Sequence, residues 1–251
     1  MHGARLLSSE AESSTPMSGT LACYGIGISL EGFSPQQIQE LGREGFETGS
    51  QPHPQASLTF RLQTDGRYFN FSVGETPIVS NQTWPLIKQV LLSYLQLAVR
   101  GMVPELVFVQ ADAVAWGDGA ILLPGRSFAG KTTLGRALVE RGCRPWAERH
   151  CALDLAGCVY PFPRSEQPAE GLPVRGIFEL TYVPGHSWSV APLTPGQASL
   201  SLAALLASRG ESPGAFLPRL AETCARAAVR LQGKRGEAGP AADSLLAELA
   251  I

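Results

Sequence analysis

One motif near the middle of the chain constrains the fold more than any other feature. Residues 125–132 read GRSFAGKT and match the Walker A pattern G-x-x-x-x-G-K-[ST]. We call these residues the glycine loop. A short apolar run at 120–123 precedes it, and residues 132–141 follow with apolar side chains at helical spacing, up to Gly142. The sequence therefore predicts a buried strand, a tight turn and a helix in succession.

The glycine loop has the composition of a phosphate-binding site. Backbone N–H groups in such a turn point inward, and the helix that follows adds the positive end of its dipole. We expect Lys131 to reach the terminal phosphates of a nucleotide and the Thr132 hydroxyl to coordinate Mg²⁺. The predicted nucleotide-binding residues are Gly125, Arg126, Ser127, Phe128, Ala129, Gly130, Lys131, Thr132 and Thr133. The competing interpretation is a glycine-rich turn that contains a lysine by coincidence.

The overall composition is that of a globular protein with little net charge. The 251 residues are 44% hydrophobic and 17% charged, and the formal net charge is -2. Because the sequence has no polybasic run and no apolar stretch of membrane-spanning length, we expect no nucleic-acid partner and no membrane partner. Five cysteines without the spacing of a zinc site, and an N-terminal segment unlike a secretory signal, favour a reducing cytoplasm.

The fold class expected for the chain is α/β, in three parts. Residues 1–18 are polar and are expected to form a disordered tail, with Met17 as a candidate start of the native protein. Residues 19–105 are expected to be β-rich with one helix. Residues 106–251 are expected to form the core that holds the glycine loop, followed by C-terminal helices, unless 19–251 is a single domain.

Apolar periodicity and turn residues place the individual elements. The expected elements are a strand at 24–28, a hairpin of strands at 58–62 and 69–73, a helix capped by Thr83 that runs to about residue 98, strands at 106–109, 152–155 and 176–183, helices at 200–208 and 216–231, a break at 233–237, and a short last helix ending near residue 249. The core is thus expected to mix strands and helices, with helices alone at its C-terminal end.

Several motifs in a fixed order resemble one family. They are YGI at 24–26, QADAV at 110–114, the glycine loop with its flanks, AERHCALD at 147–154, VYPFPR at 159–164 and GKRGEA at 233–238. Together they resemble the HPr kinase/phosphorylase-like proteins, whose core is similar to the nucleotide-binding domain of phosphoenolpyruvate carboxykinase. The resemblance implies a P-loop core of that type, ATP and Mg²⁺ as cofactors, and transfer of a phosphoryl group to a serine hydroxyl. Relatives can assemble into rings, so it also leaves a homo-oligomer open.

The resemblance carries over to two catalytic positions, both of which are altered. Similar proteins have a histidine where this chain has Gln110, and Ser-Asp-Glu or Ser-Asp-Asp where it has Ala147-Glu148-Arg149. By position, Glu148 would be the general base and, with Thr132, a Mg²⁺ partner, while Gln110 would lie near the transferred phosphate. A glutamine carries neither a proton nor a charge. A glutamate in place of an aspartate can move the carboxylate by about 1 Å.

Other polar residues have two interpretations each. Glu148 is either a base or a solvated carboxylate, and Asp112 either replaces the missing charge or has a surface or turn role. Arg126 and Arg235 either contact phosphate or form surface ion pairs. We expect Asp154 to be a turn residue, and His150 and His186 to be plain core or surface histidines.

Three functions remain in competition on this basis. The first is an ATP-dependent kinase that acts on a hydroxyl of a protein, peptide or small-molecule acceptor. The second is a nucleotide-binding partner or scaffold protein with little chemistry of its own, favoured by the altered positions Gln110, Ala147 and Arg149. The third is a generic NTPase, which ranks last because the chain lacks a clear apolar run that ends in Asp-Glu.

Overall fold

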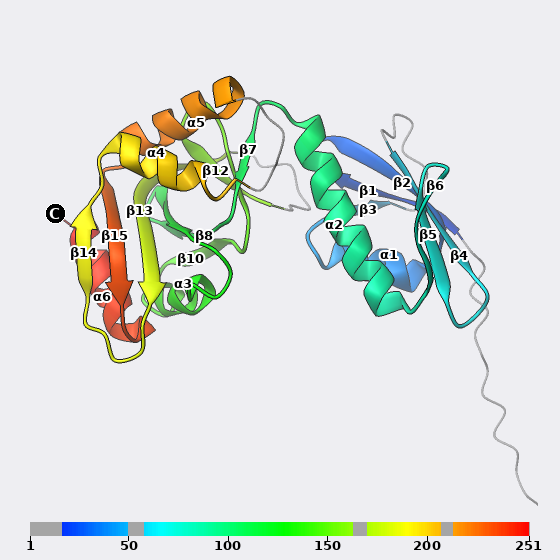
Figure 1. The fold of residues 1–251 in the computed structure, drawn as a ribbon, viewed down its shortest axis with the longest axis horizontal. Helices are drawn as coiled ribbons and strands as arrows, with labels where there is room; N and C mark the ends of the chain where they lie inside the picture. Colours follow the sequence, from blue (N-terminus) through cyan, green and yellow to red (C-terminus); the bar gives the residue numbers. More distant parts are fainter. Residues whose placement is uncertain (1–16, 50–57, 163–169, 207–212, 251) are drawn as a thin grey trace, which may run out of the picture. The chain divides into compact units, whose positions relative to one another are not determined.

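The computed structural model describes residues 17–49, 58–162, 170–206 and 213–250, and its fold is mixed α/β (Figure 1). The chain divides into two compact units, Met1–Leu92 and Ser93–Ile251, which we call unit 1 and unit 2. The division falls inside a long helix, whereas the boundary expected from the sequence followed that helix, at residue 105. Each unit has its own sheet.

Unit 1 is built on a six-stranded sheet. Its strands are β1 (Met17–Cys23), β2 (Ile26–Phe33), β3 (Glu47–Gly49), β4 (Leu58–Thr64), β5 (Phe69–Val73) and β6 (Thr76–Gln82). They lie in the order β3-β1-β2-β4-β5-β6, with β2 and β4 parallel and every other neighbouring pair antiparallel. The predicted hairpin is confirmed, because β4 and β5 pair with Thr64 opposite Phe69. Its alternating aromatic residues Phe60 and Phe71 are buried and contact each other edge to face.

Helix α1 (Pro35–Gly42) was not predicted, although the sequence carries a local signal for it. The Ser34 hydroxyl accepts the Gln37 N–H, and the Gln37 side chain accepts the Ser34 N–H, which is a complete capping box. Pro35 follows the cap, where its missing N–H costs nothing. The helix buries Ile38 and Leu41.

Helix α2 (Trp84–Met102) confirms the predicted long helix. At its start, the Trp84 ring lies edge-on to Phe33 and Phe69, and its indole N–H donates to the Glu40 carboxylate over 2.8 Å. These contacts attach the first turns of α2 to unit 1.

Unit 2 contains a larger mixed sheet. Its strands are β7 (Val107–Val109), β8 (Ala111–Trp116), β9 (Gly119–Pro124), β10 (Arg144–Ala147), β11 (Cys151–Leu153), β12 (Cys158–Pro161), β13 (Leu172–Tyr182), β14 (Ser189–Pro192) and β15 (Val229–Arg235). The order is β10-β8-β9-β13-β12-β11-β7, and β15 pairs with β13 and β14. Strand β9, which leads into the glycine loop, lies inside the sheet, because it pairs with antiparallel β8 on one side and with parallel β13 on the other. Strand β13 also runs parallel to β15.

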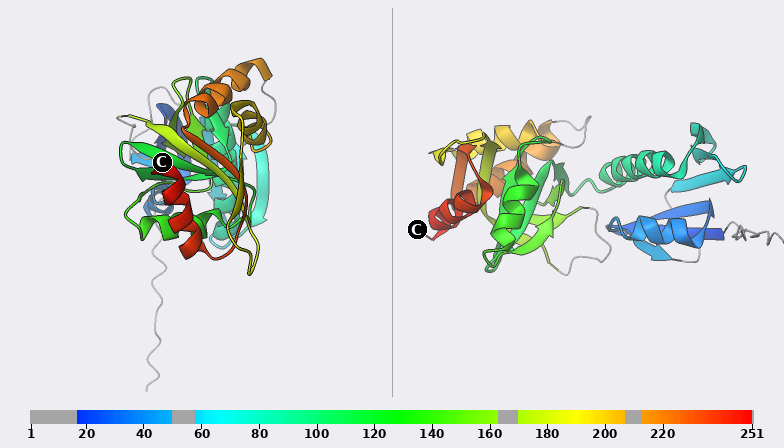
Figure 2. Two further views of the ribbon diagram at one scale, coloured as in Figure 1. Left: turned by 90° about the vertical axis from the view of Figure 1, so that its left-hand side faces the viewer. Right: turned by 90° about the horizontal axis from the view of Figure 1, so that it is seen from below.

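Four helices cover the two faces of this sheet, as Figures 1 and 2 show. They are α3 (Lys131–Val139), α4 (Pro195–Ala203), α5 (Pro213–Arg226) and α6 (Ala238–Leu249). On one face, Leu134 and Leu138 of α3 pack with Leu245 of α6. On the other, Leu202 of α4 and Leu220 of α5 pack in a second core cluster. Strand β9 and helix α3 are both packed into the core. The two ends of the glycine loop, which they flank, are therefore held in place.

Two expectations about secondary structure were wrong in part. Tyr24 and Gly25 do not belong to a strand: both have positive φ (51° and 75°) and form the two-residue turn between β1 and β2. This is the conformation that hairpin turns with right-handed strand twist require. The C-terminal region is not helical throughout, because α5 ends at Arg226 and the residues from Val229 to Arg235 form β15. Apolar spacing near 227–231 fits a helix, but pairing with β13 and β14 decides for a strand.

Several other expectations can be placed. The last helix near residue 249 is confirmed as α6, and Asp154 is the predicted turn residue, since its carboxylate accepts the N–H groups of Ala156 and Cys158. All five cysteines are free, and four of them are buried. Most of the predicted tail at 1–18 lies outside the described residues. Among the described helices, none combines the length and apolar character needed to cross a membrane.

Candidate nucleotide-binding site

The glycine loop connects a buried strand to a helix, as the sequence predicted. Every residue of β9 is buried, and α3 begins at Lys131 with Gly130 as its N-cap. Gly130 has φ 82°, and a Cβ at this position would lie 2.5 Å from the Arg235 guanidinium, so only glycine fits. Because the first N–H groups of a helix have no partner within it, the start of α3 presents donors to a ligand.

Phe128 marks the loop as strained. It is the only non-glycine loop residue with positive φ (68°), and its side chain is fully exposed. For an L-residue this conformation costs about 1 kcal/mol. The strain is maintained from the two ends of the loop, where the Gly125 N–H donates to the Gln110 carbonyl and Arg235 donates to the Gly130 carbonyl.

A buried carboxylate faces the loop from the neighbouring strand. Asp112 on β8 is 3% exposed and accepts the Thr132 hydroxyl over 2.8 Å. Its second oxygen accepts the Arg149 N–H over 2.8 Å, and Arg149 has positive φ (68°). Asp112 is therefore not a surface or turn residue, and the interpretation that it supplies the charge beside Thr132 is the one that the geometry favours.

The Lys131 side chain contacts its own loop. Its ammonium donates to the Arg126 carbonyl over 2.9 Å. Burial lowers the pKa of Lys131, while the nearby Asp112 and, less strongly, Cys151 act in the opposite direction. A lysine that is partly desolvated interacts more strongly with a phosphate than one in water.

The loop borders a cavity of about 350 Å³, which we call the loop cavity. It is lined by Gln110, Asp112, Ser127, Phe128, Gly130, Lys131, Thr132, Thr133, Arg149 and His150. Six of the nine predicted nucleotide-binding residues thus line it, while Gly125, Arg126 and Ala129 line a different cavity with Glu179 and Gln232. Arg126 is exposed and lies outside the loop cavity.

His150 was expected to be a plain core or surface histidine, but it lies in the loop cavity. Its pKa is lowered from the usual 6.5 to about 4, mainly by burial and in addition by the positive charges of Arg100, Arg149 and Lys131. The imidazole is therefore neutral near pH 7 and can form a hydrogen bond without adding a charge. His186, by contrast, lies in the turn between β13 and β14.

The depressed pKa of His150 predicts how stability depends on pH. Between about 6.5 and 4 the unfolded chain binds a proton at this residue and the folded chain does not, so the free energy of unfolding falls as the pH falls. The His150→Gln variant lacks this titrating group. Between pH 7 and pH 4.5 its free energy of unfolding should therefore fall by about 1 kcal/mol less than that of the wild-type protein, a figure that includes solvent screening. Urea unfolding at pH 7 and pH 4.5 measures it. An equal pH dependence in both proteins would contradict the assignment.

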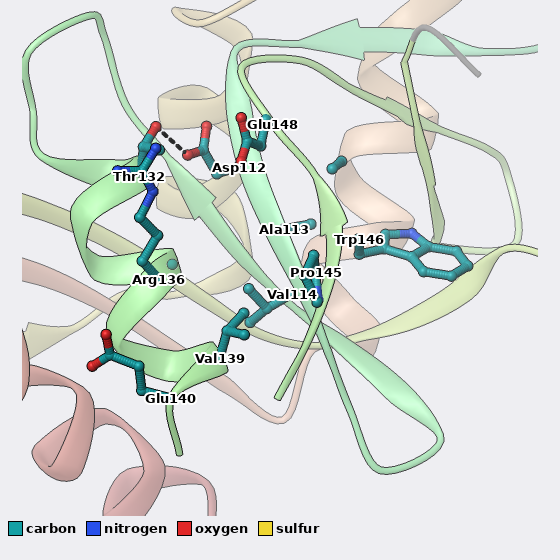
Figure 3. Close-up of a pocket in the computed structure, with 12 residues that line it drawn as sticks. Asp112, Ala113, Val114, Thr132, Arg136, Val139, Glu140, Pro145, Trp146 and Glu148 are labelled. Carbon is teal, nitrogen blue, oxygen red and sulfur yellow. Dashed lines mark hydrogen bonds between the residues drawn. The ribbon is translucent and has the colours of Figure 1, made fainter. Parts of the chain in front are cut away.

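The two predicted catalytic residues lie near the loop in different ways. The Gln110 amide donates to the Ser127 hydroxyl over 3.2 Å, so it contacts the loop itself. Glu148 follows β10 and is exposed, and in Figure 3 its carboxylate lies beside that of Asp112 and close to Thr132. The oxygen-bearing side chains of Asp112, Thr132 and Glu148 therefore lie close together at the start of α3.

A second cavity adjoins the first and shares Asp112 and Thr132 with it. It measures about 440 Å³ and lies between α3 and the strands β8 and β10; we call it the side cavity (Figure 3). It is lined by Asp112, Ala113, Val114, Thr132, Gly135, Arg136, Val139, Glu140, Pro145, Trp146, Ala147 and Glu148. Glu148 opens on this cavity and not on the loop cavity.

Arg235 holds the loop in place from β15. It is 2% exposed, donates to the Gly130 and Gly236 carbonyls over 2.7 Å each, and lies over the Tyr182 ring. Burial lowers its pKa, although Tyr182 and Glu237 oppose this effect. Both sequence interpretations of Arg235, a surface ion pair and a phosphate contact, are replaced by this structural role.

Arg235→Ala should destabilise the protein. The substitution leaves the buried Gly236 carbonyl and the half-buried Gly130 carbonyl without their donors, which costs about 2 kcal/mol. Arg226→Ala is the matched control, because Arg226 is exposed and pairs with Glu222 on the same helix, and an exposed ion pair contributes little to stability. Chemical denaturation measures both. Equal losses in the two variants would contradict the role assigned to Arg235.

The donor set fits a nucleotide and Mg²⁺. Loop amides and Lys131 suit phosphate, and the Thr132 hydroxyl with the Asp112 carboxylate suits a hard cation that keeps several water or phosphate ligands. Within the described residues no group of three or more His, Cys, Asp or Glu side chains could enclose a metal by itself. No protein-family model matches the sequence, and neither does any curated protein.

Proposed function

We propose that the protein binds ATP with Mg²⁺ at the glycine loop and transfers the terminal phosphoryl group to a hydroxyl, as the resemblance to the HPr kinase/phosphorylase-like family implies. The observation that supports this most is the hydrogen bond from the Thr132 hydroxyl to the buried Asp112 carboxylate. A threonine after the loop lysine, joined to an acidic residue on an adjacent strand, is the arrangement that P-loop proteins use to hold Mg²⁺ on nucleotide phosphates.

Each residue then has a defined task. Lys131 and the amides at the start of α3 bind the phosphates, and Thr132 with Asp112 holds the metal, which neutralises charge on the transferred group. Glu148 accepts the proton of the acceptor hydroxyl. The hydroxyl oxygen forms a bond to the terminal phosphorus, the bond to the bridging oxygen breaks, and ADP leaves with that electron pair. Asp112 already accepts two hydrogen bonds, so Glu148 is the better base.

The second candidate is a nucleotide-binding partner protein without turnover. Arg149 favours this candidate. It lines the loop cavity and stands where the HPr kinase/phosphorylase-like proteins have a carboxylate, so the charge at this position is reversed. Under this proposal the acceptor chemistry is absent and only binding remains. A cytoplasmic location remains part of the proposal in either form, and a homo-oligomer is compatible with both.

Glu148→Gln separates the two candidates. With labelled ATP and a panel of alcohol, peptide and protein acceptors, the wild-type protein should transfer phosphate, and the variant should be slower by about 10²-fold because it lacks the base. Its ATP affinity should be unchanged. Glu105→Gln is the matched control, because Glu105 is exposed and lines neither cavity. Tight ATP binding without turnover by the wild-type protein would favour the second candidate.

A further inference from the structure

The side cavity is a space without an assigned occupant, and its two ends differ in chemistry. Asp112, Thr132 and Glu148 line the end beside the loop, and the exposed Arg136 extends toward Thr132 in Figure 3. Val114, Val139 and Pro145 gather along its length, and the exposed Glu140 lies beyond Val139. Its volume of about 440 Å³ lies in the range of sites for small molecules. An occupant must therefore carry a polar group at one end and an apolar body behind it.

The position of the cavity argues against phosphate. Of the glycine loop residues only Thr132 lines it, and Lys131 does not. The Glu148 carboxylate, which lines this cavity and not the loop cavity, repels a phosphate chain but accepts a hydrogen bond from a hydroxyl. The polar end thus matches the acceptor side of the transfer reaction.

Gly135 shows that the chain keeps this space open at a cost. It lies inside α3, where glycine is less stable than alanine by about 1 kcal/mol. A Cβ at Gly135 would meet only Val114 Cγ1, at 3.9 Å, which is ordinary contact. Packing within the protein therefore does not require glycine here, and the volume that its missing side chain leaves belongs to the cavity.

We propose that the side cavity is the acceptor site, and that it takes a small molecule with an apolar aliphatic or aromatic body and a terminal hydroxyl that reaches Glu148. This inference rests on the proposed function and names the acceptor class that the proposed function leaves open. Asp112 and Thr132, which line both cavities, bring the hydroxyl and the phosphates to the same point.

Benzyl alcohol is a suitable probe, and its binding can be measured by ligand-observed NMR in the presence of Mg²⁺ and ADP. We expect saturable binding by the wild-type protein and much weaker binding of glycerol, which lacks an apolar body. Gly135→Ala should weaken benzyl alcohol binding about tenfold, because one added carbon occupies the cavity. Gly135→Leu should abolish it. Gly101→Ala on α2, where a Cβ meets nothing within 4 Å, is the matched control and should change nothing.

Separate ATP titrations keep the outcomes distinct. ATP affinity should be the same in all these variants. No saturable binding of benzyl alcohol, or binding unaffected by Gly135→Ala, would overturn the inference while intact ATP binding left the proposed function standing. Weaker ATP binding in Gly135→Ala would overturn it too, by assigning the cavity to the nucleoside. If the wild-type protein transferred phosphate to peptides but to no small molecule, and Gly135→Ala did so at the same rate, a small-molecule acceptor would be excluded. Because Ala fits without a clash, the test holds even if Gly135→Leu does not fold.

Discussion

Lys131→Ala should abolish most nucleotide binding. Its ammonium is the one positive side-chain group that the glycine loop directs into the loop cavity, and burial increases the strength of its interaction with phosphate. A hydrogen bond between charged groups contributes about 1.5–3 kcal/mol, so the loss of two such contacts lowers ATP affinity by about 10² to 10⁴-fold. Isothermal titration calorimetry with Mg²⁺ and ATP measures this directly.

Lys234→Ala is the matched control for this substitution. Lys234 is exposed on β15 and lines neither the loop cavity nor the side cavity, so ATP affinity should be unchanged. Both variants should unfold at the wild-type urea concentration, because Lys131 bonds only to a carbonyl of its own loop. Wild-type affinity in Lys131→Ala would refute the assignment of the glycine loop as a phosphate site and, with it, both proposed functions.

Asp112→Asn should have the second large effect. The amide keeps the shape of the side chain and one oxygen acceptor, but it removes the negative charge beside Thr132. We therefore expect Mg²⁺ to lose its effect on ATP affinity, and phosphoryl transfer to fall by about 10²-fold or more, because metal stabilisation of the transferred group contributes several kcal/mol. Titrations with ATP in the presence and absence of Mg²⁺ isolate the metal contribution.

Asp118→Asn provides the control in the same hairpin. Asp118 lies between β8 and β9, is exposed and pairs with Arg175, so its charge has no access to the loop. Its variant should bind Mg²⁺ and ATP like the wild-type protein. If Asp112→Asn retained the full Mg²⁺ dependence, the metal would have to be held elsewhere, with Glu148 as the other carboxylate close to Thr132.

Local signals in the sequence were enough to predict the elements that lead to the site. The alternation of Phe60, Phe71 and their neighbours gave the hairpin, and helical apolar spacing gave α2 and α3. Such patterns depend on residues a few positions apart, so neighbouring residues determine them. The helix α1 had an equally local signal, the capping box at Ser34, and could have been predicted from it.

The contacts that shape the site depend on residues far apart in the chain. Asp112 and Thr132 are 20 positions apart, and Arg235 and Gly130 are 105 apart, so no spacing rule could pair them. The same holds for β15, which is a strand because β13 and β14 offer it partners on both sides. Side-chain burial there overrides the helical spacing near Leu231.

The sequence by itself therefore determined the presence of a glycine loop between a strand and a helix, because glycine, lysine and apolar periodicity act locally. Tertiary structure decided what surrounds the loop. In the folded protein the Asp112 carboxylate accepts the Thr132 hydroxyl, Arg235 is buried, and the neutral His150 lines the loop cavity. These are consequences of which strands lie side by side, and the packing of the whole sheet fixes that order.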